Sequence, residues 1–99
     1  MPDGPYLVVG LARSGVAAAL ALRDAGRVVA CDSASPREVA VERERLARGG
    51  VEVHLDTDGT QLLAGSPPPR TLVKSPGVPH DAPVVAGARE RGIEAELTL

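Results

Sequence analysis

The segment at residues 8–15, VVGLARSG, constrains the fold more than any other part of the sequence. A short apolar run enters a turn with two glycines, and a long helix rich in alanine and leucine leaves it. Such a strand–turn–helix unit presents free backbone N–H groups to a phosphate. Asp32 follows about twenty residues later, at the end of the next apolar run, where a carboxylate can meet a ribose or a base. The sequence therefore predicts an α/β fold that binds a nucleotide diphosphate.

Each residue of this turn has an expected role. Gly10 ends the first strand and Gly15 lies inside the first helical turn, so both allow a tight turn and a close approach to phosphate. We expect Ser14 to cap the helix and Arg13 to screen phosphate charge. The dinucleotide fingerprint has a glycine where this chain has Ala12, which weighs against a long dinucleotide. A turn without a ligand is the alternative, because glycine patterns alone are weakly specific.

Length and composition narrow the class of protein. The chain has 99 residues, enough for one small domain with a single core. Tyr6 is the only aromatic residue, so aliphatic side chains must fill the core, as in a parallel sheet covered by helices. The net charge of -2, with dispersed Lys and Arg, argues against a nucleic-acid partner. The lone cysteine, Cys31, favours the cytoplasm, and no apolar run approaches the ~18 residues of a membrane span.

Strand and helix patterns alternate along the chain, without an internal repeat. Strands are predicted at residues 6–9, 27–31, 51–54, 71–74 and 94–99, and helices at residues 14–25, 36–48 and 82–91. Residues 56–65 form either one turn of helix or a loop, and the proline-rich residues 66–69 are irregular. The alternation predicts an open, Rossmann-like parallel sheet of three layers, with a ligand site at the carboxyl ends of the strands.

Helix ends are expected from local signals. Gly26 is placed to end the first helix, and Gly92 to end the last one. Ser35 and Glu38 form a capping box that begins the second helix, with a proline between them at the first helical position. Asp81 is expected to cap the last helix.

Two further loops are expected at the same edge of the sheet. Asp32 can accept a hydrogen bond from a ribose hydroxyl or a pyrimidine N–H, or it can cap its own loop, and Ser33 lies beside it. Ser75, Pro76 and Gly77 follow the fourth strand. There Gly77 would let the backbone approach a ligand and Ser75 would offer a hydroxyl, although this segment alone predicts only a turn.

The residues that most often carry catalysis form no recognisable arrangement. His54 and His80 are far apart and have no partner at metal-ligand spacing, so we expect no metal site. Cys31 lies in an apolar run and is expected to be a buried small hydrophobe. The sequence contains no P-loop and no Ser–His–acid set, so no catalytic residue is predicted.

The order of these motifs resembles the N-terminal domain of the Mur ligase family, in particular the member that adds D-glutamate. The matching segments are residues 9–15 (VGLARSG), 28–33 (VVACDS), 73–79 (VKSPGVP) and 92–97 (GIEAEL). The glycine turn is weakly specific, whereas the VKSPGVP segment, with a helix and a Gly-Ile strand behind it, is much more so. Together these segments span nearly the whole chain.

The resemblance implies a five-stranded domain that holds the UDP part of UDP-N-acetylmuramoyl-L-alanine rather than NAD. The implied UDP-binding residues are Arg13, Ser14, Gly15, Asp32, Ser33, Ser75, Pro76 and Gly77. In the family the diphosphate rests on the glycine turn, the acidic residue and its neighbour contact the uracil, and the Ser-Pro-Gly turn approaches the ribose and diphosphate. The family often has an arginine against the uracil where this chain has Ala34, and Arg37 is the nearby arginine.

The resemblance also implies an ATP-dependent ligase of peptidoglycan synthesis. In that chemistry ATP and Mg²⁺ activate a carboxylate, which the amine of D-glutamate then attacks. Residues 1–99 lack the GxxGK[ST] loop of the ATPase domain, so we expect a single substrate-binding domain that needs the ATPase and C-terminal domains for activity. The alternatives are an NAD(P)-binding domain of an oxidoreductase or regulatory sensor, and a scaffold that binds no nucleotide.

Overall fold

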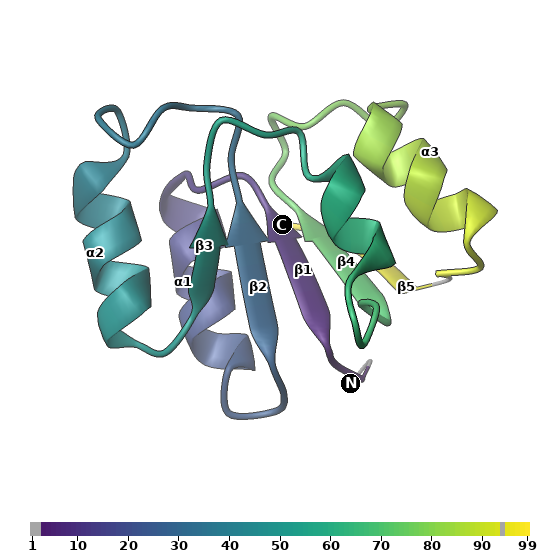
Figure 1. Cartoon of the computed structure of the whole chain (residues 1–99), viewed down its shortest axis with the longest axis horizontal. Helices are drawn as coiled ribbons and strands as arrows, with labels where there is room; N and C mark the ends of the chain where they lie inside the picture. The colour runs from purple at the N-terminus through teal and green to yellow at the C-terminus, as the bar shows by residue number, and fades with distance from the viewer. Residues whose placement is uncertain (1–2, 94) are drawn as a thin grey trace.

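The computed structural model describes residues 3–93 and 95–99, and its centre is a parallel sheet (Figure 1). The strands are β1 (Tyr6–Val9), β2 (Val28–Cys31), β3 (Glu52–His54), β4 (Thr71–Lys74) and β5 (Ala95–Thr98). They pair in the order β3-β2-β1-β4-β5, and every pair is parallel. The predicted five-stranded parallel sheet is confirmed. The expected start of the last strand, Glu94, lies outside the described residues.

Helical segments cover both faces of this sheet. They are α1 (Arg13–Leu22), α2 (Ala40–Arg48), the 3₁₀ helix η1 (Thr60–Ala64) and α3 (Pro83–Glu90). One apolar cluster joins the sheet to α1 and α2, and a second joins its other face to η1 and α3 (Figure 1). The predicted three-layer α/β fold is therefore confirmed, and η1 shows that one helical turn forms within residues 56–65.

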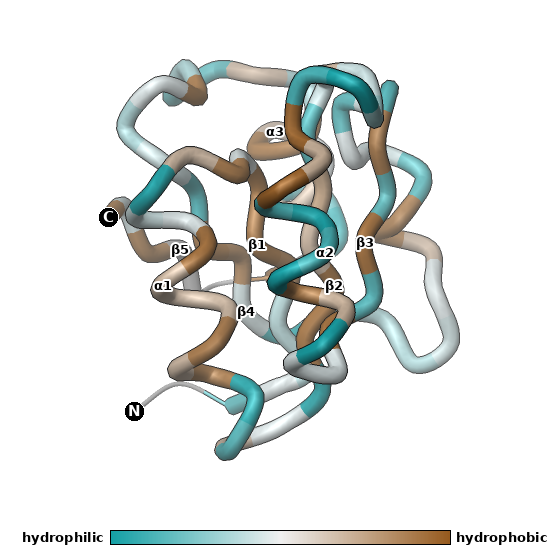
Figure 2. The backbone as a smooth tube through the Cα atoms, turned by 90° about the vertical axis from the view of Figure 1, so that its left-hand side faces the viewer, coloured by the Kyte–Doolittle hydropathy of each residue, from teal (hydrophilic) through white to brown (hydrophobic). Residues whose placement is uncertain are grey.

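Strand β1 shows how one short apolar run supplies both layers of the core. Successive side chains of a strand point to opposite faces. Tyr6 and Val8 accordingly join the cluster under α1, while Leu7 and Val9 join the cluster under α3. The central strands are hydrophobic along most of their length, whereas α2 carries hydrophilic stretches (Figure 2). This fits the burial, because Leu46 is the only buried residue of α2.

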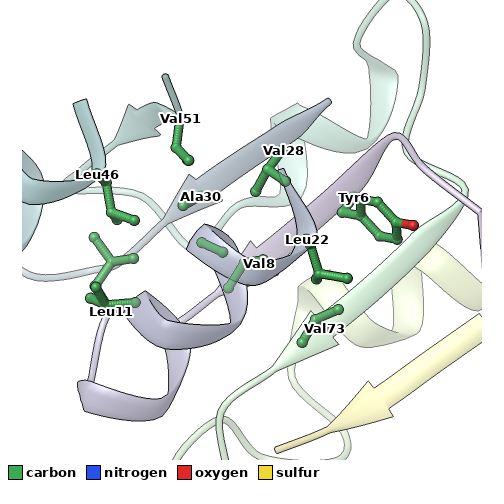
Figure 3. Packing of buried hydrophobic residues seen from close by; sticks show 11 residues of the cluster. Tyr6, Val8, Leu11, Leu22, Val28, Ala30, Leu46, Val51 and Val73 are labelled. Carbon is green, nitrogen blue, oxygen red and sulfur yellow. The ribbon is translucent and has the colours of Figure 1, made fainter. Parts of the chain in front are cut away.

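The single aromatic ring is held in the cluster on the α1 side. Tyr6 is 2% exposed and lies among aliphatic side chains that include Leu22 and Val28 (Figure 3). A Cβ atom at Gly4 would come within 2.8 Å of the Tyr6 ring, and one at Gly26 within 3.3 Å. These two positions therefore favour glycine because the ring packs directly against their backbone.

The ends of α1 differ from the prediction. The helix begins at Arg13, its N-cap is Ala12, and no side chain caps it, so the expected cap by Ser14 is wrong. It ends at Leu22 rather than near residue 25, and Gly26 is not its C′ residue. The reason is tertiary packing, because Gly26 is placed against the Tyr6 ring and not at the helix end.

The capping box of α2 forms only in part. The hydroxyl of Ser35 donates to Glu38 Oε1 at 3.0 Å, and the Ser35 N–H lies 3.3 Å from the same oxygen. Because the hydroxyl bonds to the Glu38 side chain and not to a backbone N–H, it does not cap a helix there. Residues 36–39 form turns, and α2 begins at Ala40 with Val39 as its N-cap. The predicted start at residue 36 is therefore wrong.

The last helix also lacks the predicted cap. Its N-cap is Ala82, without a side-chain hydrogen bond, so the expected cap by Asp81 is wrong. Pro83 occupies the first turn, and because it has no N–H, that end of the helix has one donor fewer to satisfy. Gly92 follows the helix with φ of 75°, which confirms it as the residue that ends α3. None of the helices in the described part of the chain combines the length and apolar character required to cross a membrane.

Candidate functional site

Three predicted loops begin side by side because their strands end level with one another. Val9 is in register with Cys31 of β2 and with Lys74 of β4. The residues that directly follow these three strand ends are Gly10 after β1, Asp32 after β2 and Ser75 after β4. The sheet order reverses at β1, which has β2 on one side and β4 on the other. In open α/β sheets ligands bind outside the carboxyl ends of the strands at such a switch point.

A groove of about 390 Å³ lies at this point. Its polar lining comes from Asp32, Ser33, Thr57, Asp58 and Ser75. Its apolar lining comes from Val9, Val78 and the beginning of α3, and the backbone of Gly10 and Gly77 completes it. A groove of this size, mostly apolar with a few polar groups, is typical of small-molecule sites.

Close backbone contacts hold the first loop in place. Gly10 has φ of 100°, and a Cβ atom there would come within 2.5 Å of Ser75 Oγ. Ser75 is 6% exposed, and its N–H donates to Val9 O at 3.0 Å. A Cβ atom at Gly15 would lie 1.9 Å from the carbonyl oxygen of Gly10. The tight turn predicted for these two glycines is confirmed, and it packs the loop against both α1 and the Ser75 turn.

Asp32 connects the first loop to the second. Its Oδ2 accepts the N–H of Leu11 at 2.7 Å, and its Oδ1 accepts the N–H of Ala34 at 2.8 Å. The loop-capping role considered for Asp32 is therefore present. A carboxylate has about four lone-pair positions, so both oxygens retain capacity toward the groove that Asp32 lines.

The predicted site residues divide into two groups. The residues that line the groove are Asp32, Ser33, Ser75 and Gly77. Outside its lining, Arg13 and Ser14 are exposed in the first turn of α1, Gly15 is buried behind them, and Pro76 is exposed in the loop after β4. The N-terminus of α1 therefore presents Arg13, and no acidic residue lies in its first turn.

A fourth loop, after β3, was missed by sequence reasoning. Thr57 Oγ1 accepts the N–H of Gly59 at 3.1 Å and donates to Gln61 Oε1 at 2.7 Å. Asp58 Oδ1 accepts the N–H of Thr60 at 2.9 Å, and this bond is the main cause that lowers the pKa of Asp58. The available signal was the segment LDTDG, which directly follows the strand predicted at residues 51–54, just as Asp32 follows the strand predicted at residues 27–31.

Cys31 lies in the sheet beneath the loops after β2 and β3. Its side chain is 0% exposed, and a Cβ atom at Gly59 would come within 2.8 Å of its sulfur. Burial raises the pKa of the Cys31 thiol to about 12, with smaller contributions from the charges of Asp32 and Asp58. The thiol therefore stays protonated at neutral pH, and the prediction of a buried small hydrophobe is confirmed.

The remaining titratable residues singled out in the sequence lie outside the groove lining. His54 Nε2 lies 2.6 Å from Glu52 Oε2, and this contact is the main cause that lowers the pKa of Glu52. The ring of His80 lies 3.3 Å from the guanidinium of Arg89. Among residues 3–93 and 95–99, no group of three or more His, Cys, Asp or Glu side chains is arranged to hold a metal ion.

Comparisons with known proteins test the resemblance to the Mur ligase family independently of the structure. No family model matches the chain. UDP-N-acetylmuramoylalanine–D-glutamate ligase from Microcystis aeruginosa is 42% identical over 96 residues, covering 93% of this chain and 21% of that protein. Ligases of the same name are 39% identical over 95 residues in Synechocystis and 37% identical over 87 residues in Halalkalibacterium halodurans.

These matches cover 93% and 88% of this chain, respectively, but only 21% and 19% of the two relatives. The chain thus spans about one fifth of the length of the curated relatives it matches. The resemblance predicted from the glycine turn and the VKSPGVP segment is confirmed: over this domain the chain is homologous to the D-glutamate-adding ligases of the Mur family.

Proposed function

We propose that residues 1–99 form a substrate-binding domain that holds the UDP part of UDP-N-acetylmuramoyl-L-alanine. The observation that carries this proposal is the groove at the switch point, where Asp32 and Ser75 follow neighbouring strands and line one cavity. The similarity to D-glutamate-adding ligases supports the same choice of ligand. The whole protein would then act in peptidoglycan synthesis in the cytoplasm.

The diphosphate is assigned to the N-terminus of α1. The backbone N–H groups of a first helical turn attract anions, and α1 has no side-chain cap that competes for them. Arg13 and Ser14 are exposed in that turn, so both are available to phosphate oxygens. The part of Gly15 in this proposal is to let the turn pack closely enough to present these groups.

The nucleoside is assigned to the groove. Asp32 and Ser33 would contact the uracil, because a carboxylate accepts the imide N–H and a hydroxyl both donates and accepts. Ser75, Pro76 and Gly77 would approach the ribose and the diphosphate from β4. Asp32 disfavours NADP in particular, because a carboxylate repels a 2′-phosphate.

The ligation chemistry is assigned to parts of the whole protein beyond this domain. ATP and Mg²⁺ do not fit the residues of this chain, because it has no GxxGK[ST] loop. The described residues also offer no three-residue carboxylate, histidine or cysteine cluster for a metal ion. The partners of the domain are therefore the ATPase and C-terminal domains, and residues 1–99 alone would bind substrate without ligating it.

Nuclear magnetic resonance titration of the ¹⁵N-labelled chain tests the proposal. We expect UDP and UDP-N-acetylmuramoyl-L-alanine to shift the amide signals of residues 10–15, 32–34 and 75–78, while NADH at the same concentration shifts them less. A stronger response to NADH would overturn the proposal in favour of a dinucleotide-binding domain. No response to any of the three ligands at millimolar concentration would favour the scaffold alternative.

Replacing Asp32 with Asn tests its assigned contact. Asn keeps one carbonyl oxygen for a backbone N–H but loses the charge and one acceptor, so UDP affinity should fall by about 1–3 kcal/mol. The free energy of unfolding must be measured in parallel, because Asp32 also ties Leu11 to Ala34. Unchanged UDP affinity in a folded variant would contradict the role of Asp32 in binding.

A further inference from the structure

The groove has an acidic side that the predicted site residues only partly explain. Asp32 lines it from the loop after β2, and Asp58 lines it from the loop after β3. Both carboxylates act on the same buried group, since the charges of both contribute to the raised pKa of Cys31. The positive end of α1, with exposed Arg13, belongs to the loop after β1. The site is therefore electrically asymmetric.

The position of Asp58 is set by its own loop. Gly59 has φ of 90° and sits so close to Cys31 that a Cβ atom would come within 2.8 Å of the sulfur. The neighbouring side chain of Thr57 accepts the Gly59 N–H, and Asp58 Oδ1 accepts the Thr60 N–H. These contacts fix the carboxylate at the groove wall, and its lowered pKa keeps it charged at neutral pH.

The asymmetry selects which part of a ligand lies beside Asp58. A phosphate would be repelled by two carboxylates, so the ligand must present a neutral part with hydrogen-bond donors there. A nucleoside offers two kinds of donor, the N–H groups of the base and the two hydroxyls of the ribose. With Asp32 and Ser33 assigned to the base, and the Ser75 turn approaching the ribose from β4, the ribose hydroxyls still lack an acceptor on the side of the groove that Asp58 lines.

We propose that Asp58 is a second recognition residue of the groove, which accepts hydrogen bonds from the ribose hydroxyls of the bound nucleotide. This inference rests on the proposed function, because it takes UDP as the ligand. It adds a residue from a loop that the sequence motifs did not include. It also gives the groove a means of distinguishing ribonucleotides from nucleotides that lack these hydroxyls.

The test combines a change in the protein with a change in the ligand. The affinities of UDP and 2′,3′-dideoxy-UDP are measured by calorimetry for the unmodified chain and for Asp58→Asn. Asn keeps an oxygen for the Thr60 N–H but removes the charged acceptor. We expect the unmodified chain to prefer UDP about tenfold, and we expect this preference to fall below about threefold in the variant.

Asp56→Asn is the matched control. Asp56 is exposed in the same loop and does not line the groove, so this variant removes one charge without removing the proposed contact. Its preference for UDP should equal that of the unmodified chain. Asp58→Ser, whose hydroxyl can still accept the Thr60 N–H, serves as a second variant if Asp58→Asn does not fold, and the same loss of preference is expected.

The outcomes separate the two proposals. If UDP binds and both the unmodified chain and the Asp58 variant prefer it equally over the dideoxy compound, the role of Asp58 is overturned while the proposed function stands. If the Asp56 variant loses the preference as well, the effect is long-range charge and the assigned contact is overturned. If the unmodified chain does not bind UDP at all, the proposed function fails, and this inference fails with it.

Discussion

The loops after β1 and after β3 reach the same groove by different means. The first loop is held by backbone packing, since Gly10 lies against Ser75 and Gly15 lies against the Gly10 carbonyl. The second is held by short polar side chains, with Thr57 and Asp58 bonded to N–H groups just downstream and Gly59 placed over Cys31. Close backbone packing requires glycines, so the loop after β1 leaves a recognisable pattern in the sequence. Hydrogen bonds from side chains to the backbone use residues that are common in any loop, so the loop after β3 leaves no such pattern.

The largest expected effect is at Gly15, the glycine of α1 that packs against the loop after β1. Replacing Gly15 with Ala places a Cβ atom 1.9 Å from a backbone oxygen, and only a shift of the turn or of α1 can relieve that contact. We expect the free energy of unfolding to fall by about 3 kcal/mol or more, measured by urea denaturation. Gly77→Ala is the control, since its nearest atom would be at 3.9 Å, and it should change stability little. Equal losses in the two variants would contradict this account.

Replacing Gly59, in the loop after β3, should lower the stability somewhat less than replacing Gly15. In Gly59→Ala the residue keeps φ of 90° and meets the end of a side chain, Cys31 Sγ, rather than backbone. We expect a loss of about 2 kcal/mol, of which about 1 kcal/mol is backbone strain. Combining it with Cys31→Ala removes the steric part, so the penalty of the alanine should fall to about 1 kcal/mol in that background. An unchanged penalty would show that Cys31 does not limit this position.

The pH dependence of the free energy of unfolding tests whether the Cys31 thiol is buried beneath the loop after β3. The unfolded Cys31 thiol ionises near its ordinary pKa of 9.0, whereas the folded thiol stays protonated up to about 12. The unfolded state therefore loses its proton first, and the contribution of Cys31 is complete below pH 9 and is lost as the pH rises toward 12. Between about pH 8 and about pH 10 the unmodified chain should lose about 1.4 kcal/mol more than Cys31→Ala. Parallel curves for the two proteins would refute the burial of the thiol.

The smallest expected effect is at the side chains that hydrogen-bond to the backbone of the loop after β3. Thr57→Val keeps the shape of the side chain but leaves the N–H of Gly59, a buried residue, without its acceptor. We expect a loss of about 1 kcal/mol in thermal or urea unfolding. Thr98→Val, at an exposed threonine of β5, provides the comparison and should change stability less. If Thr57→Val is neutral, the loop is held by Gly59 and Asp58 alone.

The fold was predictable because its signals are local. The central strands β1 and β2 are short apolar runs, and Tyr6–Val9 and Thr71–Lys74 match the prediction residue for residue. The helix ends were less predictable because they depend on contacts between distant parts of the chain. A glycine such as Gly26 is typical of the position just after a helix. Its actual position against the Tyr6 ring depends on packing that no local sequence pattern reveals.

The site was predictable where a residue directly follows a central strand. Asp32 and Ser75 come next after β2 and β4, so the sheet places both at the groove. Strand β3 ends at His54, in register with Cys31, and the loop that follows it contains two residues with positive φ, Asp56 and Gly59. Thr57 and Asp58 lie between these two residues and line the groove. The fit of Gly59 over Cys31 is a contact between distant parts of the chain, so Thr57 and Asp58 could not be assigned from spacing alone.

The sparse burial of α2 has a consequence for motion. Among its residues only Leu46 is buried, and Arg23, at the end of α1, donates to Gly49 O at 2.9 Å just beyond the end of α2. So few attachments mean that this helix can unfold locally at a lower free energy than the rest of the domain. We expect its amide hydrogens to exchange with deuterium sooner than those of α1. Because no residue of α2 lines the groove, this opening can take place while a ligand remains bound.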